Sequence, residues 1–263
     1  MSASLAPPAP GRASVGAEPS GGVGPTRDLA AGTLYVVATP IGNLEDITLR
    51  ALRVLRDVDV IAAEDTRRTR TLLAAYGVST PLVSYFEHNK LRREPALLRQ
   101  LQAGRRVALV TDAGTPGISD PGGHLVRLAR DAGIPVVPVP GPSAVIAALS
   151  AAGVPADRFV FEGFLPAKSG RRLTRLRQLQ GLGRALVLYE SPHRLMATLD
   201  ALAEVFGPVE VVLAREVTKR FEEFRRGTPA ELRAAFETGG VRGEVTLIVG
   251  PTGEPVVAPE SDA

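Results

Sequence analysis

The sequence contains no cysteine and only three histidines in 263 residues: His88, His124 and His193. The absence of cysteine excludes a disulfide framework, a thiolate metal site and a cysteine nucleophile. The histidines are far apart and none lies at the spacing of metal ligands, so we expect no metal site. No apolar run approaches the roughly 20 residues of a membrane-spanning helix, and the N-terminus lacks the apolar core of a signal peptide. We therefore expect a cytoplasmic protein without membrane contact.

Lysine is also scarce, because only Lys90, Lys168 and Lys219 are lysines among the 31 Lys and Arg residues. The net charge of +3 identifies no partner by itself. The dominance of arginine, together with abundant alanine, glycine and proline, indicates a bias in genomic base composition. A lysine kept against that bias indicates a position that needs a flexible point charge.

The two ends of the chain have few large apolar side chains. Residues 1–31 are mainly Ala, Pro, Gly and Ser, and residues 252–263 are similar. Such segments cannot bury enough apolar surface to offset the entropy of folding. We predict a disordered N-terminal extension over 1–31 and a flexible tail over 252–263.

Strand and helix patterns alternate between these ends, which is typical of an α/β protein. We predict two α/β domains, 32–152 with a mostly parallel sheet and 153–251 with a mixed sheet. The predicted strands lie at 34–38, 58–63, 82–85, 107–111, 136–139, 159–164, 185–189, 209–214 and 244–249. The predicted helices lie near 47–55, 66–76, 92–102, 121–132, 144–152, 169–180, 193–206 and 229–238. Prolines shorten the strand at 136–139 and place it near an edge of its sheet.

One corner between a strand and a helix stands out. The strand 107–111 is apolar enough to be buried on both faces, and 112–123 then holds four glycines, two prolines and two aspartates. Asp120 before Pro121 matches the N-cap of a helix with proline at its first position. A strand that feeds a helix through a glycine-rich loop is typical of a ligand-binding corner. The alternative is a long turn with only a structural role.

Common phosphate-binding and nucleophile motifs are missing. The corner after the first strand has one glycine, Gly42, where a dinucleotide site has Gly-x-Gly-x-x-Gly. Neither a P-loop nor a Gly-x-Ser-x-Gly elbow occurs. The chemistry therefore has to come from another set of corners. Seven segments form that set: 38–46, 63–67, 112–122, 140–144, 161–166, 189–194 and 215–219.

In their order and spacing, over about residues 33–250, these segments resemble the tetrapyrrole-methylase-like superfamily of S-adenosylmethionine-dependent methyltransferases. Within it the chain is most similar to the ribose 2'-O-methylases of small-subunit ribosomal RNA. The resemblance implies two α/β domains with S-adenosyl-L-methionine between them, and a homodimer. It implies methylation of the ribose 2'-O of a cytidine in the decoding region of 16S ribosomal RNA, in the assembled subunit.

The same resemblance places the cofactor. Its methionine and ribose ends would lie against one group of residues: Ile41, Asp112, Gly114, Thr115, Ile118, Ser143 and Ala144. Its adenine side would meet a second group: Tyr189, Ala214, Glu244 and Thr246. Proline and glycine corners agree with this in kind, because they expose backbone N–H and C=O groups without side-chain obstruction.

A ribose hydroxyl must lose a proton when it is methylated, and a carboxylate or a desolvated lysine can accept it. Glu64 and Asp65 are the first candidates, at the end of the second strand, followed by Asp112 and Glu190. Asp65 has an alternative role as the cap of the helix at 66–76, and Asp112 as a tie within its own loop.

Candidate RNA contacts are basic or aromatic residues outside these corners. His88 and Lys90 lie beside Tyr85 and Phe86, and His88 is either an ordinary surface residue or a stacking partner for RNA. The segment 168–177 carries five positive charges and no acid, among them Lys168, Arg171 and Arg172. As a helix it would turn Leu173 and Leu176 toward the second sheet and leave its arginines outside.

Two other functions compete with RNA methylation. A methylase of a small tetrapyrrole-like ring would share fold and cofactor, but it has no use for the basic segment 168–177. A non-catalytic RNA-binding or ribosome-assembly protein would not need the full set of cofactor corners. Calorimetry with S-adenosylmethionine separates them: both kinds of methylase should bind this cofactor, whereas a non-catalytic RNA-binding or assembly protein should not.

Overall fold

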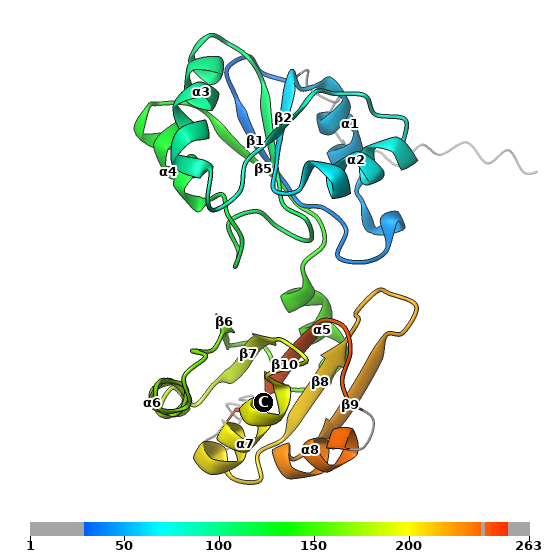
Figure 1. Ribbon diagram of the computed structural model, residues 1–263, viewed down its shortest axis with the longest axis vertical. Helices are drawn as coiled ribbons and strands as arrows, with labels where there is room; N and C mark the ends of the chain where they lie inside the picture. The colour runs from blue at the N-terminus through cyan, green and yellow to red at the C-terminus, as the bar shows by residue number, and fades with distance from the viewer. Residues whose placement is uncertain (1–28, 238–239, 252–263) are drawn as a thin grey trace, which may run out of the picture.

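The computed structural model describes residues 29–237 and 240–251 and contains two five-stranded sheets (Figure 1). Most of the predicted extension 1–31 and the whole tail 252–263 lie outside the described residues. The first sheet has the order β3-β2-β4-β1-β5, and each of its pairings is parallel. Its strands are β1 (Leu34–Val37), β2 (Val60–Ala63), β3 (Leu82–Ser84), β4 (Val107–Val110) and β5 (Val136–Val139).

Helices cover both faces of the first sheet, which explains why its central strands are apolar throughout. Along β1, Leu34 packs in the cluster formed with α3 and α4, whereas Tyr35 and Val37 pack in the cluster formed with α1 and α2. This alternation is the period of two of a strand buried on both faces. The helices are α1 (Leu49–Asp57), α2 (Thr66–Ala75), α3 (Lys90–Gln102) and α4 (Gly123–Asp131).

The second sheet is mixed, with the order β6-β7-β10-β8-β9. Only its β6–β7 pairing is parallel, and the pairings of β7–β10, β10–β8 and β8–β9 are antiparallel. Its strands are β6 (Phe159–Phe164), β7 (Ala185–Glu190), β8 (Val211–Arg215), β9 (Glu223–Gly227) and β10 (Val245–Val249). One face packs against α6 (Ser169–Gln180), α7 (Leu195–Phe206) and α8 (Pro229–Glu237).

Helix α5 (Ala144–Ala152) covers the other face of the second sheet. Its Val145, Ala148 and Leu149 pack with Val187 of β7 and Ile248 of β10. By packing, α5 therefore belongs with the second half, although the sequence boundary near Gly153 assigns it to the first. Figure 1 shows α5 directly below the segment that joins the two sheets.

Most predicted elements are confirmed, with two differences. Strand β9 was not predicted, because Glu223–Gly227 is charged and lacks apolar alternation; it lies at the edge of the sheet, where charge prevents edge-to-edge pairing. Helix α4 begins at Gly123 with Gly122 as its N-cap, so the prediction of Asp120 as the cap was wrong. Strand β5 lies at an edge, as Pro138 indicated. None of the described helices is long and apolar enough to span a membrane.

Candidate active site

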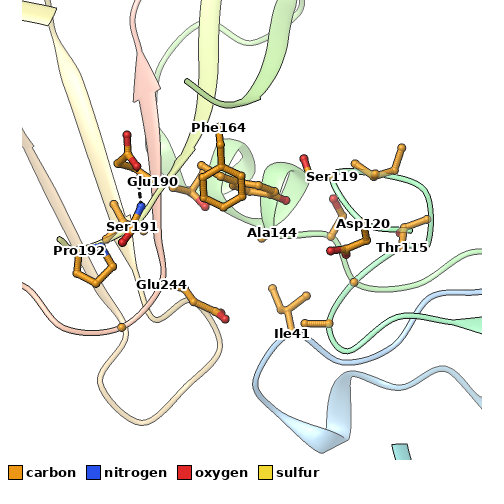
Figure 2. A pocket seen from close by; sticks show the side chains of 18 residues that line it. Ile41, Thr115, Ser119, Asp120, Ala144, Phe164, Glu190, Ser191, Pro192 and Glu244 are labelled. Atoms are coloured by element: carbon orange, nitrogen blue, oxygen red, sulfur yellow. Dashed lines mark hydrogen bonds between the residues drawn. The ribbon is translucent and has the colours of Figure 1, made fainter. Parts of the chain in front are cut away.

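A cavity of about 380 Å³ lies between the two sheets (Figure 2). The first half contributes Ile41 and the loop 113–120, which follow β1 and β4. The second half contributes the start of α5 and the ends of β6, β7 and β10. The carboxyl ends of parallel strands are the usual place for a ligand in an α/β sheet. The volume falls within the ~300–1,000 Å³ of small-molecule sites.

The wall on the side of the first sheet is held by backbone hydrogen bonds between two corners. Thr39 and Gly114 form an isolated antiparallel bridge, with N–H···O distances of 2.9 and 3.0 Å. The Thr39 hydroxyl donates to the carbonyl of Thr111 at 3.0 Å. Gly114 adopts φ +85°, a conformation that glycine takes without strain, and its bare backbone faces the cavity. Glycine at this position thus allows the backbone bridge to Thr39 to form and lets a ligand approach the backbone closely.

Asp120 is the carboxylate of the first half that lines this cavity, and it points inward in Figure 2. Burial raises its pKa to about 6, and the negative charges of Glu64, Asp112 and Glu244 add to the rise. A carboxyl group with such a pKa is ionised at neutral pH and is still basic enough to accept a proton. The sequence did not place Asp120 in this cavity, because the pair Asp120–Pro121 matched a helix cap.

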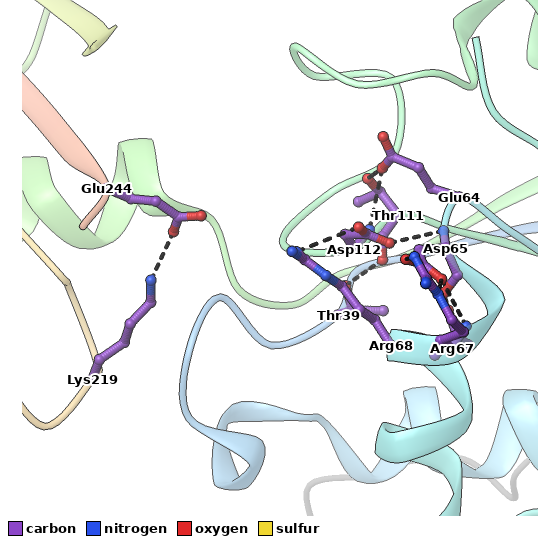
Figure 3. A network of polar contacts seen from close by, with 10 residues as sticks. Thr39, Glu64, Asp65, Arg67, Arg68, Thr111, Asp112, Lys219 and Glu244 are labelled. Carbon is purple, nitrogen blue, oxygen red and sulfur yellow. Dashed lines mark hydrogen bonds and ion pairs between the residues drawn. The ribbon is translucent and has the colours of Figure 1, made fainter. Parts of the chain in front are cut away.

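A strained loop of the second half carries a charge network to the cavity mouth. The ammonium of Lys219 contacts Glu216 at 2.8 Å. It also contacts Glu244 at 2.9 Å (Figure 3). Glu216 and Thr218 have φ of +51° and +69°, which is unusual for residues with a Cβ and concentrates at functional sites. The side chain of Lys219 lies against Gly42, where a Cβ would collide with it. The network therefore joins the second half to the corner after β1.

Lys219 is unsuited to take a proton. Burial opposes its charged form, but the hydrogen bonds to Glu216 and Glu244 outweigh burial and raise the pKa of Lys219. A general base at neutral pH needs a lowered lysine pKa. The flexible point charge that the rarity of lysine suggested is thus used to hold Glu244, one wall of the cavity.

The sequence matches the family model of Tetrapyrrole (Corrin/Porphyrin) Methylases over residues 33–233. A Pseudomonas aeruginosa protein named Ribosomal RNA small subunit methyltransferase I is 52% identical, over 89% of this chain and 85% of its own length. A Thermotoga maritima protein of the same name is 49% identical, over 83% of this chain and 98% of its own length. The chain belongs to the tetrapyrrole methylase family. Both of these relatives carry the name of a methyltransferase of small-subunit ribosomal RNA.

A solved structure supports the tetrapyrrole methylase fold. Uroporphyrin-III C-methyltransferase from Thermus thermophilus, complexed with S-adenosylhomocysteine, superimposes with a TM-score of 0.60 and 21% identity. The match covers 83% of this chain and 97% of that one. The two-sheet architecture predicted from the sequence is therefore the architecture of this family.

Most residues expected to bind the cofactor line the larger cavity: Ile41, Gly114, Thr115, Ile118, Ser143, Ala144, Tyr189, Glu244 and Thr246. Asp112 and Ala214 do not line it. Asp112 lies on the far side of the Thr39–Gly114 bridge and lines a second, smaller cavity. Ala214 is fully buried in β8 beneath α5. The cavity also includes Asp120 and Phe164, which the sequence analysis did not assign to it.

Glu64 and Asp65, the first candidates for a base, do not line the larger cavity. Asp65 caps α2: its side chain accepts from the backbone N–H of Arg67 at 2.8 Å and pairs with the guanidinium of the same residue (Figure 3). These contacts lower the pKa of Asp65 to about 2, so it accepts a proton poorly. Glu64 accepts the hydroxyl hydrogen of Thr111 at 2.6 Å. The alternative role of Asp65 as a helix cap is what the structure shows.

Asp112 and Glu190, the other two candidates for the base, also have structural partners. Asp112 accepts from the backbone N–H of Asp65 at 2.9 Å, and burial raises its pKa. Glu190 lines the larger cavity but accepts from the Thr198 hydroxyl at 2.6 Å and from the N–H of Ser191 at 2.8 Å. Both carboxylates hold neighbouring backbone or side chains in place. Asp120 is left as the cavity carboxylate best suited to accept a proton.

The candidate RNA residues lie away from the cavity wall. His88 is exposed and meets Phe86 edge to face, with ring centroids 6.2 Å apart. Lys90 begins α3 and pairs with Glu87 at 2.6 Å. Lys168 and Arg171 are exposed at the start of α6. These positions remain accessible to a large substrate.

Arg172 differs from its neighbours, because only 6% of it is exposed. It shares the inner face of α6 with Leu176 and Leu179, which are also buried and follow it by four and seven residues. The expectation that the arginines of this helix all stay outside is therefore wrong for Arg172. Its side chain packs in the interior and is not available to RNA.

Among residues 29–237 and 240–251, no group of three or more His, Cys, Asp or Glu side chains is arranged to hold a metal ion. The acids near the cavity pair instead with arginine, lysine or hydroxyl groups.

Proposed function

We propose that this protein is an S-adenosylmethionine-dependent methyltransferase of small-subunit ribosomal RNA, which methylates the 2'-oxygen of a cytidine ribose. The observation that carries the proposal is the cavity between the two sheets, built from the corners that resemble this family. Calorimetry with S-adenosylmethionine tests the cofactor. Mass mapping of 16S ribosomal RNA from a deletion strain tests the substrate, because one ribose methyl group should be missing. Intact methylation in that strain contradicts the proposal.

The residues of the cavity fit this cofactor. Its walls are mostly apolar, with Ile41, Ala144 and Phe164 among them, and bare glycine backbone stands at Gly114. Asp120 and Glu244 add negative charge, which suits a ligand with a sulfonium and an ammonium group. When bound, the cofactor supplies an activated methyl group.

The protein has two tasks in such a transfer. The first is positioning, because an in-line displacement at the methyl carbon requires the ribose oxygen to be held opposite the sulfur atom. The Thr39–Gly114 bridge and the Lys219–Glu244 pair fix the two sides of the cavity for this. The second task is proton removal, which we assign to the carboxylate of Asp120. Its carboxylate would accept the proton that the ribose 2'-hydroxyl loses when the bound sulfonium supplies its methyl group.

We further propose that the substrate is the assembled small subunit, met in the cytoplasm, and that the protein acts as a homodimer. The resemblance to the tetrapyrrole methylase family, which implies a homodimer, supports a second copy. Sedimentation at micromolar concentration tests the dimer. A monomer under those conditions contradicts it.

Replacing Lys168 and Arg171 together by glutamine is expected to weaken binding to the small subunit. If both contact phosphate, the slope of log affinity against log salt falls by about two, because each such contact contributes about one. Cofactor affinity should not change. Arg172 is left intact, because its burial means that its removal would disturb the fold.

The matched control removes Arg127 and Arg130, two exposed charges on α4. An equal effect of this control would show that net charge, rather than α6, sets the affinity. An unaltered salt slope in the Lys168/Arg171 variant would place the RNA elsewhere, with the segment 90–93 next.

Chelation is expected to leave the enzyme active. The described residues offer no cluster of metal ligands, and a sulfonium methyl group needs no further activation. Enzyme treated with EDTA and desalted should retain its rate within about twofold on subunits that carry their own magnesium. Calorimetry in EDTA should give the untreated cofactor affinity, which removes any effect of metal on RNA folding. A loss restored by one added metal would contradict the prediction.

A further inference from the structure

A second cavity of about 120 Å³ lies on the other side of the Thr39–Gly114 bridge. Thr39, Pro40 and Asp112 line it from the corners after β1 and β4, and Ile41, Ala113 and Gly114 of the same corners line the larger cavity. The two cavities therefore share one wall, the bridge. Helix α2 closes the far side of the smaller cavity with Arg68 and Leu72.

Hydrogen bonds leave only part of this lining free to recognise a ligand. The threonine hydroxyls donate within the protein, Thr39 to the carbonyl of Thr111 and Thr69 to the carbonyl of Asp65. Asp112 uses one oxygen for the N–H of Asp65, and its other oxygen lies 3.4 Å from the guanidinium of Arg68. This ion pair is long, and the Arg68 side chain is 69% exposed. The guanidinium N–H groups of Arg68 and the second carboxylate oxygen of Asp112 therefore lie side by side at the cavity, as donors and an acceptor for a ligand.

We propose that this smaller cavity binds the base of the nucleotide to be methylated, and that Asp112 and Arg68 select cytosine. This inference rests on the proposed function. The edge of cytosine presents an amino donor beside two acceptors, which matches a carboxylate beside a guanidinium. Uracil presents a carbonyl where cytosine has the amino group, and that oxygen would face the carboxylate of Asp112.

The dimensions support a single ring. The cavity has about a third of the volume of the larger one, which is proposed to hold an adenosine joined to an amino acid. Apolar Pro40, Leu44 and Leu72 offer surfaces for the faces of a ring. A free phosphate is disfavoured, because the half-buried carboxylate of Asp112 repels it.

The position also suits the chemistry. A base in the smaller cavity puts its ribose at the shared bridge, next to Gly114 and the larger cavity. The outer face of α2 is basic, since Arg67, Arg68 and Arg70 are exposed and Thr66–Ala75 contains no acid. A phosphate chain that enters beside α2 would meet these charges before its base reached Asp112.

The test uses small subunits reconstituted with either cytidine or uridine at the target position, and the full-length enzyme. Arg68→Gln and Asp112→Asn should each lower the cytidine-to-uridine ratio of methylation rates about tenfold or more, the value of one hydrogen bond to a charged group. Asp112→Asn keeps an oxygen for the N–H of Asp65, so the loop can keep its tie. Cofactor affinity should stay within about twofold in both variants.

Arg67→Gln is the matched control, because Arg67 is the adjacent exposed arginine and does not line the cavity. It should weaken binding of both substrates equally and leave their ratio unchanged. An unchanged ratio in Arg68→Gln and Asp112→Asn, with methyl transfer by the unmodified enzyme intact, overturns the inference. Absence of methyl transfer by the unmodified enzyme overturns the proposed function instead.

Discussion

Replacing Ala144 by phenylalanine is expected to abolish cofactor binding while the fold stays intact. Ala144 is the first residue of α5 and lines the larger cavity. A phenyl ring at this point occupies the volume that the ligand needs, and the helix start tolerates it without backbone strain. Calorimetry should show S-adenosylmethionine affinity reduced at least about 100-fold, which corresponds to about 2.7 kcal/mol. The melting temperature without cofactor should change by no more than about 2 °C.

Ala151→Phe serves as the matched control, because it makes the same change at an exposed position near the other end of α5. It should leave cofactor affinity unaltered. Gly114 is a less clean target, since its φ of +85° means that any side chain adds backbone strain to the steric block. Normal affinity in Ala144→Phe would show that the cofactor binds outside this cavity.

The parallel sheet and its corners could be predicted because they depend on local pattern. Strands such as Val107–Val110 are apolar on both faces, and glycine and proline mark where the chain must turn toward a ligand. Strand β9 carries little such information, because Glu223–Gly227 pairs through its backbone at a sheet edge with charged side chains outside. Its place is decided by β8 and not by its own composition.

The errors at Asp120 and Arg172 have a common physical origin. Each residue was read from its neighbours along the chain, whereas its role is set by the tertiary structure. Asp120 stands before Pro121 as a helix cap would, but the loop continues to Gly122 and leaves the carboxyl group in the cavity. Arg172 is charged, yet its position on α6 puts it on the same face as Leu176. Packing also decides that α5 covers the second sheet, which sequence order alone does not show.

Replacing Asp120 by asparagine is expected to lower the rate of methyl transfer about 10²- to 10⁴-fold, the usual contribution of a general base. Cofactor affinity should fall by no more than about fivefold, because Glu244 still supplies negative charge to the cavity. In the unmodified enzyme, the rate should decrease as the pH falls through about 6, where burial places the pKa of Asp120. Asp131→Asn, an exposed acid on α4, is the control and should change neither quantity.

The same substitution should make the protein more stable at neutral pH. Folding raises the pKa of Asp120 from 3.8 to about 6. The folded state therefore holds this proton more tightly than the unfolded state, and the free energy of unfolding falls as the pH rises from about 4 to above 6. Asparagine carries no charge there, and we expect a gain of about 1–2 kcal/mol above pH 6, reduced from the full shift by contact with solvent. Below pH 4 the two proteins should melt alike.

If Asp120 had only a structural role, Asp120→Asn would lower activity and stability together. If Asp120 only held the cofactor, the variant would lose cofactor affinity with little change in the rate at saturation. A more stable protein that binds cofactor and transfers methyl slowly is the outcome that assigns the proton to Asp120.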